Sequence, residues 1–114
     1  MLSIIVPCKN EEEAIPLFYP VLKENLDKMN VEYELLIVDD GSTDKTVEVS
    51  LELKEKDPNI KVISFSRNFG KEAGMLAGMK EAKGDYVVVM DADLQDPPAL
   101  LSEMYNYVNS GEYD

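Results

Sequence analysis

Apolar runs alternate with segments of helical periodicity along the whole chain, and this alternation limits the fold more than any other feature. The apolar runs predict strands over residues 2–7, 33–39, 60–65 and 85–90, and the segments between and after them predict helices over about 11–29, 44–56, 71–83 and 97–109. Successive strand–helix units are typical of a parallel sheet with right-handed crossovers and helices on both faces. The predicted fold class is therefore α/β, a Rossmann-like parallel sheet.

The expected order of the strands indicates where a ligand would bind. Open parallel sheets bind ligands beyond the carboxyl ends of their strands, at the point where the strand order reverses. With the order 3-2-1-4, this point lies between the first and fourth strands. Polar segments follow the strands around it: Pro7-Cys8-Lys9-Asn10-Glu11, Asp39-Asp40 and Asp91-Ala92-Asp93. We expect these segments to surround one crevice.

The end of the fourth strand has the composition of a metal site. Asp91 and Asp93 are separated by one small residue, and Gln95 follows two positions later. Carboxylate and amide oxygens are the ligands that hard divalent cations such as Mg²⁺ or Mn²⁺ require. The alternative is an ordinary loop before a helix, because Asp96-Pro97-Pro98 is a common helix start. The second acidic strand end, at Asp39 and Asp40, favours the metal site.

Composition excludes several classes of function. The chain has 114 residues and a net charge of −12, so a nucleic-acid partner is not expected. It has no histidine, which excludes histidine-based catalysis and zinc bound by histidine. The single Cys8 rules out an internal disulfide and favours a reducing, cytoplasmic setting, with Cys8 itself buried as packing. No apolar run is long enough to span a membrane, and no signal peptide is visible. The ending at Gly111–Asp114 suggests a longer protein that has been truncated.

Three of the predicted helices carry residues that indicate where the helix starts, bends or packs. Pro16 suits an opening turn of the first helix, whereas Pro20 is expected to kink or restart it. Gly70, Gly74 and Gly78 recur every four residues, which predicts one face of the third helix packed closely on the sheet. We expect Ser42, Thr43 and Asp44 to cap the second helix.

Together these motifs resemble the nucleotide-sugar-binding half of the family 2 inverting glycosyltransferases, which have the GT-A fold. The resemblance is carried, in order, by Ile4-Ile5-Val6-Pro7 with Lys9-Asn10-Glu11, by Val38-Asp39-Asp40-Gly41-Ser42-Thr43-Asp44, and by Asp91-Ala92-Asp93. The segments Ser66-Arg67-Asn68-Phe69-Gly70-Lys71 and Met90 to Pro98 are more narrowly similar to the dolichyl- and undecaprenyl-phosphate sugar transferases. On this resemblance, residues 1–114 form the N-terminal, donor-binding part of a GT-A domain.

The resemblance implies a role for each site residue. Pro7, Lys9 and Glu11 would line the nucleoside pocket, with Asp39 accepting a hydrogen bond from the base and Asp40 beside it. An acceptor at Asp39 suits both uracil and guanine, so UDP and GDP both stay possible. Asp91, Asp93 and Gln95 would hold Mg²⁺ or Mn²⁺ on the diphosphate, because an anionic donor is repelled by carboxylates unless a cation intervenes. Arg67 and Lys71 would add positive charge near the phosphates, or else remain solvated surface cations.

The implied reaction is inverting transfer of a sugar from the nucleotide to an acceptor, with the metal stabilising the departing diphosphate. In the full-length protein the expected acceptor is a polyprenyl phosphate at the cytoplasmic face of the membrane, reached through segments that this chain lacks. The catalytic base, the sugar and the oligomeric state are left open, and the fragment alone is expected to bind donor weakly and to transfer little.

Four alternatives remain at this point. In the first, the acceptor would be a carbohydrate hydroxyl; in the second, the chain would be a non-catalytic module that binds a nucleotide or is purely structural. The third is an Asp-nucleophile phosphatase, which also uses Asp-x-Asp. Its motif typically follows the first strand, whereas the motif of this chain follows the fourth. The fourth is a sugar-nucleotide pyrophosphorylase, which has a related fold. Its Gly-rich basic loop after the first strand is absent here, where the chain has Cys8-Lys9-Asn10-Glu11.

Overall fold

The computed structural model describes residues 1–67 and 69–92, apart from the side chain of Lys71. The elements are β1 (Leu2–Cys8), α1 (Ala14–Met29), β2 (Tyr33–Asp39), α2 (Thr46–Lys56), β3 (Ile60–Ser64), α3 (Lys71–Glu81) and β4 (Tyr86–Val89). Each described element matches a predicted one to within a few residues. The helix predicted over 97–109 lies outside the described residues.

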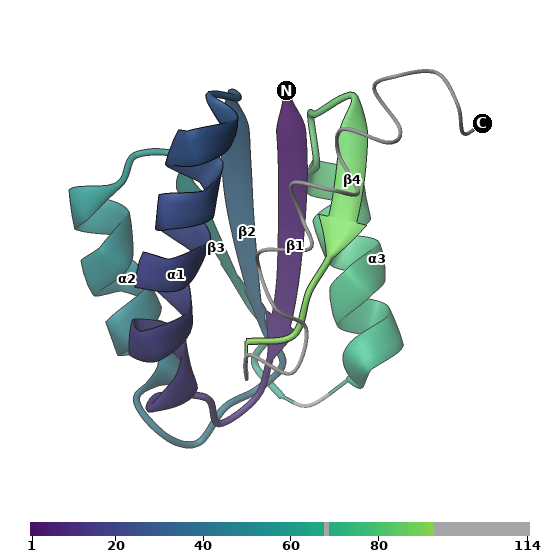
Figure 1. The fold of residues 1–114 in the computed structure, drawn as a ribbon. Helices are drawn as coiled ribbons and strands as arrows, with labels where there is room; N and C mark the ends of the chain where they lie inside the picture. The colour runs from purple at the N-terminus through teal and green to yellow at the C-terminus, as the bar shows by residue number, and fades with distance from the viewer. Residues whose placement is uncertain (68, 93–114) are drawn as a thin grey trace.

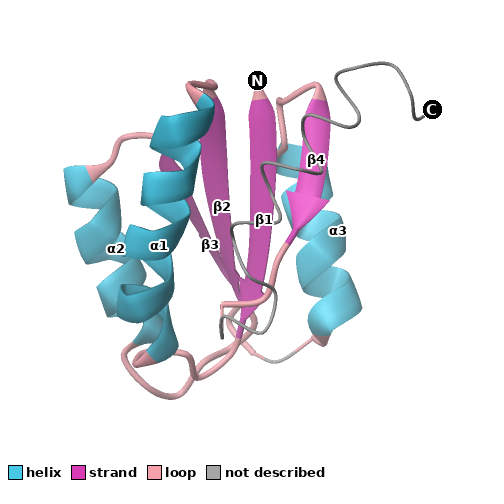
Figure 2. Cartoon of the chain, viewed as in Figure 1, coloured by secondary structure: helices cyan, strands magenta, loops and turns pink. Residues whose placement is uncertain are grey.

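The strands form a parallel sheet in the order β3-β2-β1-β4, as predicted. The register pairs Ile4 of β1 with Leu35 of β2, and Leu2 with Tyr86 of β4. Helices α1 and α2 cover one face of the sheet and α3 covers the other (Figure 1). The loops that follow the strands gather at one edge of the sheet (Figure 2). The order therefore reverses between β1 and β4, where the sequence places its polar segments.

The core is divided unequally between the two faces. The larger cluster lies between the sheet and α1, where Ile15, Phe18, Leu22 and Leu26 are at most 2% exposed. Every residue of β2 is buried, so this central strand contributes to both faces. Full burial of one such apolar side chain contributes about 1.5–3 kcal/mol. The smaller cluster, of Ile5, Leu36 and Val38, lies on the face that α3 covers.

Helix α1 corrects one prediction. Pro16 lies in its first turn, where the missing amide hydrogen costs no helical bond, as expected. Pro20 lies inside the helix, which is nevertheless assigned as one uninterrupted element. Of the two predicted effects, the restart is wrong, because the buried face of Ile15, Phe18, Leu22 and Leu26 holds both halves against the sheet, and the kink stays a prediction.

The glycines of the third helix play different parts. A Cβ atom on Gly78 would lie 2.6 Å from Cγ2 of Ile5, and one on Gly74 would lie 3.6 Å from Cγ1 of Val38. These two glycines face the sheet, as predicted. Gly70 does not belong to this face, because it precedes α3 with φ of 98°. Its role is in the backbone conformation of the turn, which favours glycine.

A buried carboxylate joins the amino ends of several elements. Glu34 is 4% exposed and accepts hydrogen bonds from Ser3 Oγ at 2.6 Å, Lys61 Nζ at 2.9 Å and the Lys83 amide at 2.5 Å. Burial alone would raise the Glu34 pKa, but these bonds outweigh it and lower the pKa to about 2. Glu34 therefore links β1, β2, β3 and the turn before β4 in its ionised form.

Within the described part of the chain, none of the helices combines the length and the apolarity needed to cross a membrane.

Candidate functional site

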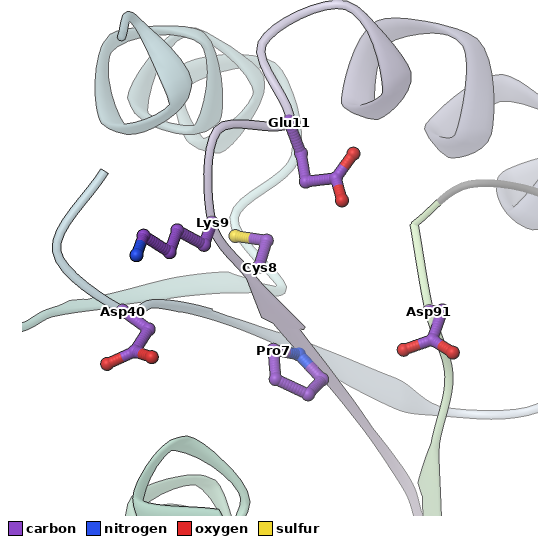
Figure 3. A pocket seen from close by; sticks show the side chains of 6 residues that line it. All are labelled: Pro7, Cys8, Lys9, Glu11, Asp40 and Asp91. Atoms are coloured by element: carbon purple, nitrogen blue, oxygen red, sulfur yellow. The ribbon is translucent and has the colours of Figure 1, made fainter. Parts of the chain in front are cut away.

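A pocket of about 200 Å³ opens at the carboxyl ends of β1, β2 and β4. Its lining residues come from segments far apart in the sequence: Pro7, Cys8, Lys9, Glu11, Asp40 and Asp91. Figure 3 shows Lys9 and Asp40 on one side of the pocket, Asp91 on the other, and Glu11 on the loop above them. The crevice predicted at the reversal of strand order is confirmed. Its volume is below the roughly 300–1,000 Å³ of pockets that enclose a whole drug-sized ligand, so it suits part of a larger one.

The segment after β1 provides most of the lining. Pro7 and Cys8 are the last residues of the strand, and Lys9 follows as an exposed side chain. Glu11 is half-buried, and its carbonyl accepts the Ile15 amide at 3.0 Å at the start of α1. The chain thus turns from strand to helix around the pocket with one cation and one carboxylate in its wall.

Asp91 comes from the segment after β4, which the backbone ties to β1. The Met90 amide donates to the Ile5 carbonyl at 2.9 Å, so the chain leaves the sheet beside β1 and places Asp91 in the pocket wall. Asp93 and Gln95, the other predicted metal ligands, lie outside the described residues. Among residues 1–67 and 69–92, no group of three or more histidine, cysteine, aspartate and glutamate side chains is arranged to hold a metal. Of the three predicted metal ligands, Asp91 is therefore the one that lies within the described residues, where it lines the pocket.

Asp40 lines the pocket but is 6% exposed, and its carboxylate is engaged by backbone amides. Oδ1 accepts the Phe69 amide at 2.7 Å, and Oδ2 accepts the Gly70 amide at 3.0 Å. The residue predicted to bind substrate therefore also anchors the loop before α3. Sequence spacing carried no signal of this contact.

Asp39, which was predicted to bind the base, is not among the residues that line the pocket. It is 2% exposed and accepts hydrogen bonds from the Ser42 amide at 3.2 Å, from Ser64 Oγ at 3.4 Å and from Ser42 Oγ. These contacts hold the turn after β2 against the end of β3. Asp39 is thus the neighbour of two lining residues, Asp40 along the chain and Cys8 across the sheet, but it does not itself line the pocket.

The two predicted phosphate-side cations lie in the β3–α3 connection. Arg67 is exposed, does not line the pocket, and places its guanidinium 5.0 Å from the centre of the Phe69 ring. Lys71 is the first residue of α3, and its side chain lies outside what the structure describes. Asp40 connects this segment to the pocket through the Phe69 and Gly70 amides.

Cys8 is part of the pocket wall yet is only 5% exposed. Burial, and then the negative charges of Asp39, Glu11 and Asp44, raise the pKa of its thiol to about 12. A thiol with so high a pKa is almost entirely protonated at neutral pH and is a poor nucleophile. The prediction that Cys8 serves packing is confirmed.

The loop after β2 is only partly as predicted. Asp44 accepts the amide of Thr46, the first residue of α2, at 2.9 Å, which is the contact expected at a helix start. Ser42 and Thr43 instead form hydrogen bonds with Asn10 in the loop after β1. The expectation that they cap α2 is therefore wrong, because a loop close in space offers Asn10 as a partner.

Comparison with known proteins decides the family. The model of "Glycosyl transferase family 2" matches residues 3–114. The chain belongs to this family. The resemblance in its motifs is thereby confirmed over nearly the whole sequence.

Curated relatives include bacterial glycosyltransferases. The "Uncharacterized glycosyltransferase YkcC" of Bacillus subtilis is 51% identical over 90% of this chain and 32% of its own length. The "Prophage bactoprenol glucosyl transferase homolog" of Escherichia coli K12 is 39% identical over 96% of this chain and 36% of its own length. The chain thus spans about a third of the relatives that it matches.

Solved structures confirm the fold of this family 2 chain. A mannosyltransferase from Pyrobaculum calidifontis, in complex with GDP-Man and Mn²⁺, superposes with a TM-score of 0.80 at 26% identity, over 94% of this chain and 32% of its own. Staphylococcus aureus TarS, in complex with UDP-GlcNAc, superposes with a TM-score of 0.70 at 26% identity, over 96% of this chain and 31% of its own. The parallel sheet is therefore the Rossmann-like sheet of GT-A glycosyltransferases.

Proposed function

We propose that residues 1–114 form the donor-binding part of a metal-dependent inverting glycosyltransferase that transfers a sugar from a nucleoside diphosphate to polyprenyl phosphate. The observation that carries the proposal is the meeting of Lys9, Glu11 and Asp91 in one pocket at the reversal of strand order. This position is where open α/β sheets bind nucleotides.

The charge of the pocket supports a metal-bridged donor. Three of its six lining side chains are carboxylates and one is an ammonium group. A diphosphate would be repelled by this wall unless a cation lay between them. Asp91, with Asp93 and Gln95, would hold Mg²⁺ or Mn²⁺, which supplies charge stabilisation for the departing nucleoside diphosphate. The mannosyltransferase with a similar fold was solved with Mn²⁺, which agrees with this choice.

The remaining residues of the site would bind and orient the nucleotide. Pro7, Lys9 and Glu11 would contact the nucleoside, and Asp39 would bind the base in place of its hydrogen bonds from Ser42. Asp40 would hold the loop that carries Arg67 and leads to Lys71, so that both cations lie toward the phosphates. The similar structures contain GDP-Man and UDP-GlcNAc, so both bases fit the proposal.

The acceptor is proposed from chemistry and from the relatives. A lipid phosphate is already anionic and attacks the anomeric carbon without a general base, whereas a sugar hydroxyl requires one. Relatives at 39–40% identity are named bactoprenol glucosyl transferases, which favours a polyprenyl phosphate over a carbohydrate hydroxyl. A full-length protein that glycosylates an oligosaccharide but not undecaprenyl phosphate would overturn this part of the proposal.

Nucleotide binding tests the core of the proposal. We expect UDP or GDP with Mn²⁺ to bind the chain in calorimetry, and EDTA to abolish binding. Asp91→Asn should weaken binding about tenfold or more, since it removes a charged metal ligand.

The matched control is Asp85→Asn at the other end of β4, where the carboxylate is 81% exposed and pairs with the amino terminus at 3.0 Å. This variant should bind like the wild type. Equal affinities of Asp91→Asn and the wild type, or binding that survives EDTA, would contradict a metal at Asp91. A chain that binds neither UDP nor GDP would favour a purely structural module.

A further inference from the structure

Asn10 stands between two pocket residues in an unusual backbone conformation. Lys9 and Glu11 both line the pocket, and Asn10 has φ of 55°, in the left-handed region. This region costs most side chains roughly 1–2 kcal/mol, whereas asparagine visits it more readily. The sharp turn at Asn10 allows its two neighbours to enter the wall of the same pocket.

The side chain and amide of Asn10 attach this turn to the loop after β2. The Asn10 amide donates to Ser42 Oγ at 2.9 Å, and Asn10 Oδ1 accepts from the Thr43 amide at 2.9 Å and from Thr43 Oγ1 at 3.3 Å.

The amides that follow continue this attachment. The Glu11 amide donates to Thr46 Oγ1 at 2.8 Å, and the Glu12 amide donates to Asp44 Oδ2 at 3.3 Å. Three consecutive amides of the first loop thus donate to side chains of the loop after β2 and of Thr46, the first residue of α2. In the opposite direction, Asn10 Oδ1 accepts hydrogen bonds from Thr43.

We infer that Asn10 is a positioning residue for the donor pocket. It does not line the pocket and is exposed. It acts through Lys9 and Glu11, whose placement depends on the bonds between Asn10 and the Ser42-Thr43 turn. The expected effect of Asn10 on nucleotide binding rests on the proposed function. Its expected effect on the turn does not depend on that function.

The variant Asn10→Gly separates the side chain from the backbone conformation. Glycine adopts the left-handed region freely, so only the bonds to Oδ1 are lost. Asn30→Gly is the matched control, because Asn30 has φ of 53° and ends α1. Both variants exchange a left-handed asparagine for glycine, so the control carries the same backbone change, and only Asn10→Gly also loses the bonds from Thr43 to Oδ1.

Cys8 reports on the turn without any nucleotide. It is the single cysteine of the chain, lines the pocket and is 5% exposed. Loosening of the Lys9–Glu11 turn should expose it, so a thiol reagent should react about fivefold faster with Asn10→Gly than with Asn30→Gly. This factor corresponds to the loss of about one net hydrogen bond.

The affinity for UDP and for GDP with Mn²⁺, measured by calorimetry, completes the test. We expect a similar, about fivefold, loss in Asn10→Gly and none in Asn30→Gly. Equal Cys8 rates in the two variants would overturn the inference. A faster Cys8 reaction with unchanged nucleotide affinity would also overturn it, because the turn would then be merely structural. A wild-type chain that binds neither nucleotide refutes the proposed function, and the Cys8 rates then still decide whether Asn10 holds the turn.

Discussion

The carboxylate of Asp40 accepts the backbone amide of Phe69 at 2.7 Å, across 29 positions of the sequence. Asp40 follows β2 and lines the pocket, and Phe69 lies in the loop before α3. A second bond reaches Gly70, so one side chain fixes the approach to α3. The end of the central strand thereby connects the pocket to the loop that carries Arg67.

Asp40→Asn should loosen that loop, because one acceptor oxygen is replaced by an amide group that cannot accept the facing N–H. We expect a loss of about 1–3 kcal/mol in the free energy of unfolding. Hydrogen exchange at the Phe69 and Gly70 amides should become faster, while exchange in β1 stays slow. Asp91→Asn is the control, and unchanged protection of the Phe69 amide in Asp40→Asn would refute the anchoring role.

Acid should weaken the fold through Glu34. Its folded-state pKa of about 2 lies below the ordinary glutamate value of 4.5, so its ionisation stabilises the fold above pH 4.5. That contribution, about 2–3 kcal/mol, should be lost as the pH falls from 4.5 toward 2.

Glu34→Gln should be less stable at neutral pH, and its stability should fall less steeply in this acidic range. Urea unfolding at several pH values measures both effects. Parallel curves for the two proteins between pH 4.5 and pH 2 would show that another group is responsible.

The two helical glycines of α3 should respond oppositely to alanine. A methyl group on Gly78 would collide with Ile5, and overpacking of this kind costs about 1–3 kcal/mol. A Cβ atom on Gly74 would lie at an ordinary contact distance of 3.6 Å from Cγ1 of Val38. Gly74→Ala should therefore raise the free energy of unfolding by about 0.5–1 kcal/mol through helix propensity. Thermal unfolding measures both, and similar shifts for the two variants would contradict the packing of α3 on β1.

The thiol of Cys8 should react slowly and with an unusual pH dependence. A pKa of about 12 in place of 9.0 lowers the thiolate fraction at pH 8 about a thousandfold. Alkylation of the folded protein should therefore keep accelerating as the pH rises through 9, where an ordinary thiol levels off. Unfolding in urea should restore the ordinary rate, and a fast reaction of the folded chain at pH 8 would contradict the buried placement of Cys8.

Patterns among residues close together in the sequence predicted the secondary structure, the sheet and much of the candidate site. The alternation of apolar runs and helical segments predicted the parallel sheet, since each element reveals its own periodicity. The reversal of strand order then predicted that Glu11 and Asp91 would meet, because parallel strands direct their following loops to the same edge. Each family motif is a short run of neighbouring residues along the chain, such as Val38 to Asp44, so the motifs too were visible in the sequence.

Contacts between loops were decided only by the tertiary structure. Local spacing favoured Ser42 and Thr43 as helix caps, and it gave no sign of their bonds to Asn10 more than 30 positions away. Similarly, Asp40 was predicted only to bind substrate, and Pro20 was predicted to kink or restart the first helix. The physical reason is common to all of these residues. A hydrogen-bonding group or a helix face takes the partner that folding brings nearest, and that partner is chosen by how the elements pack, whereas periodicity along the chain specifies only the elements themselves.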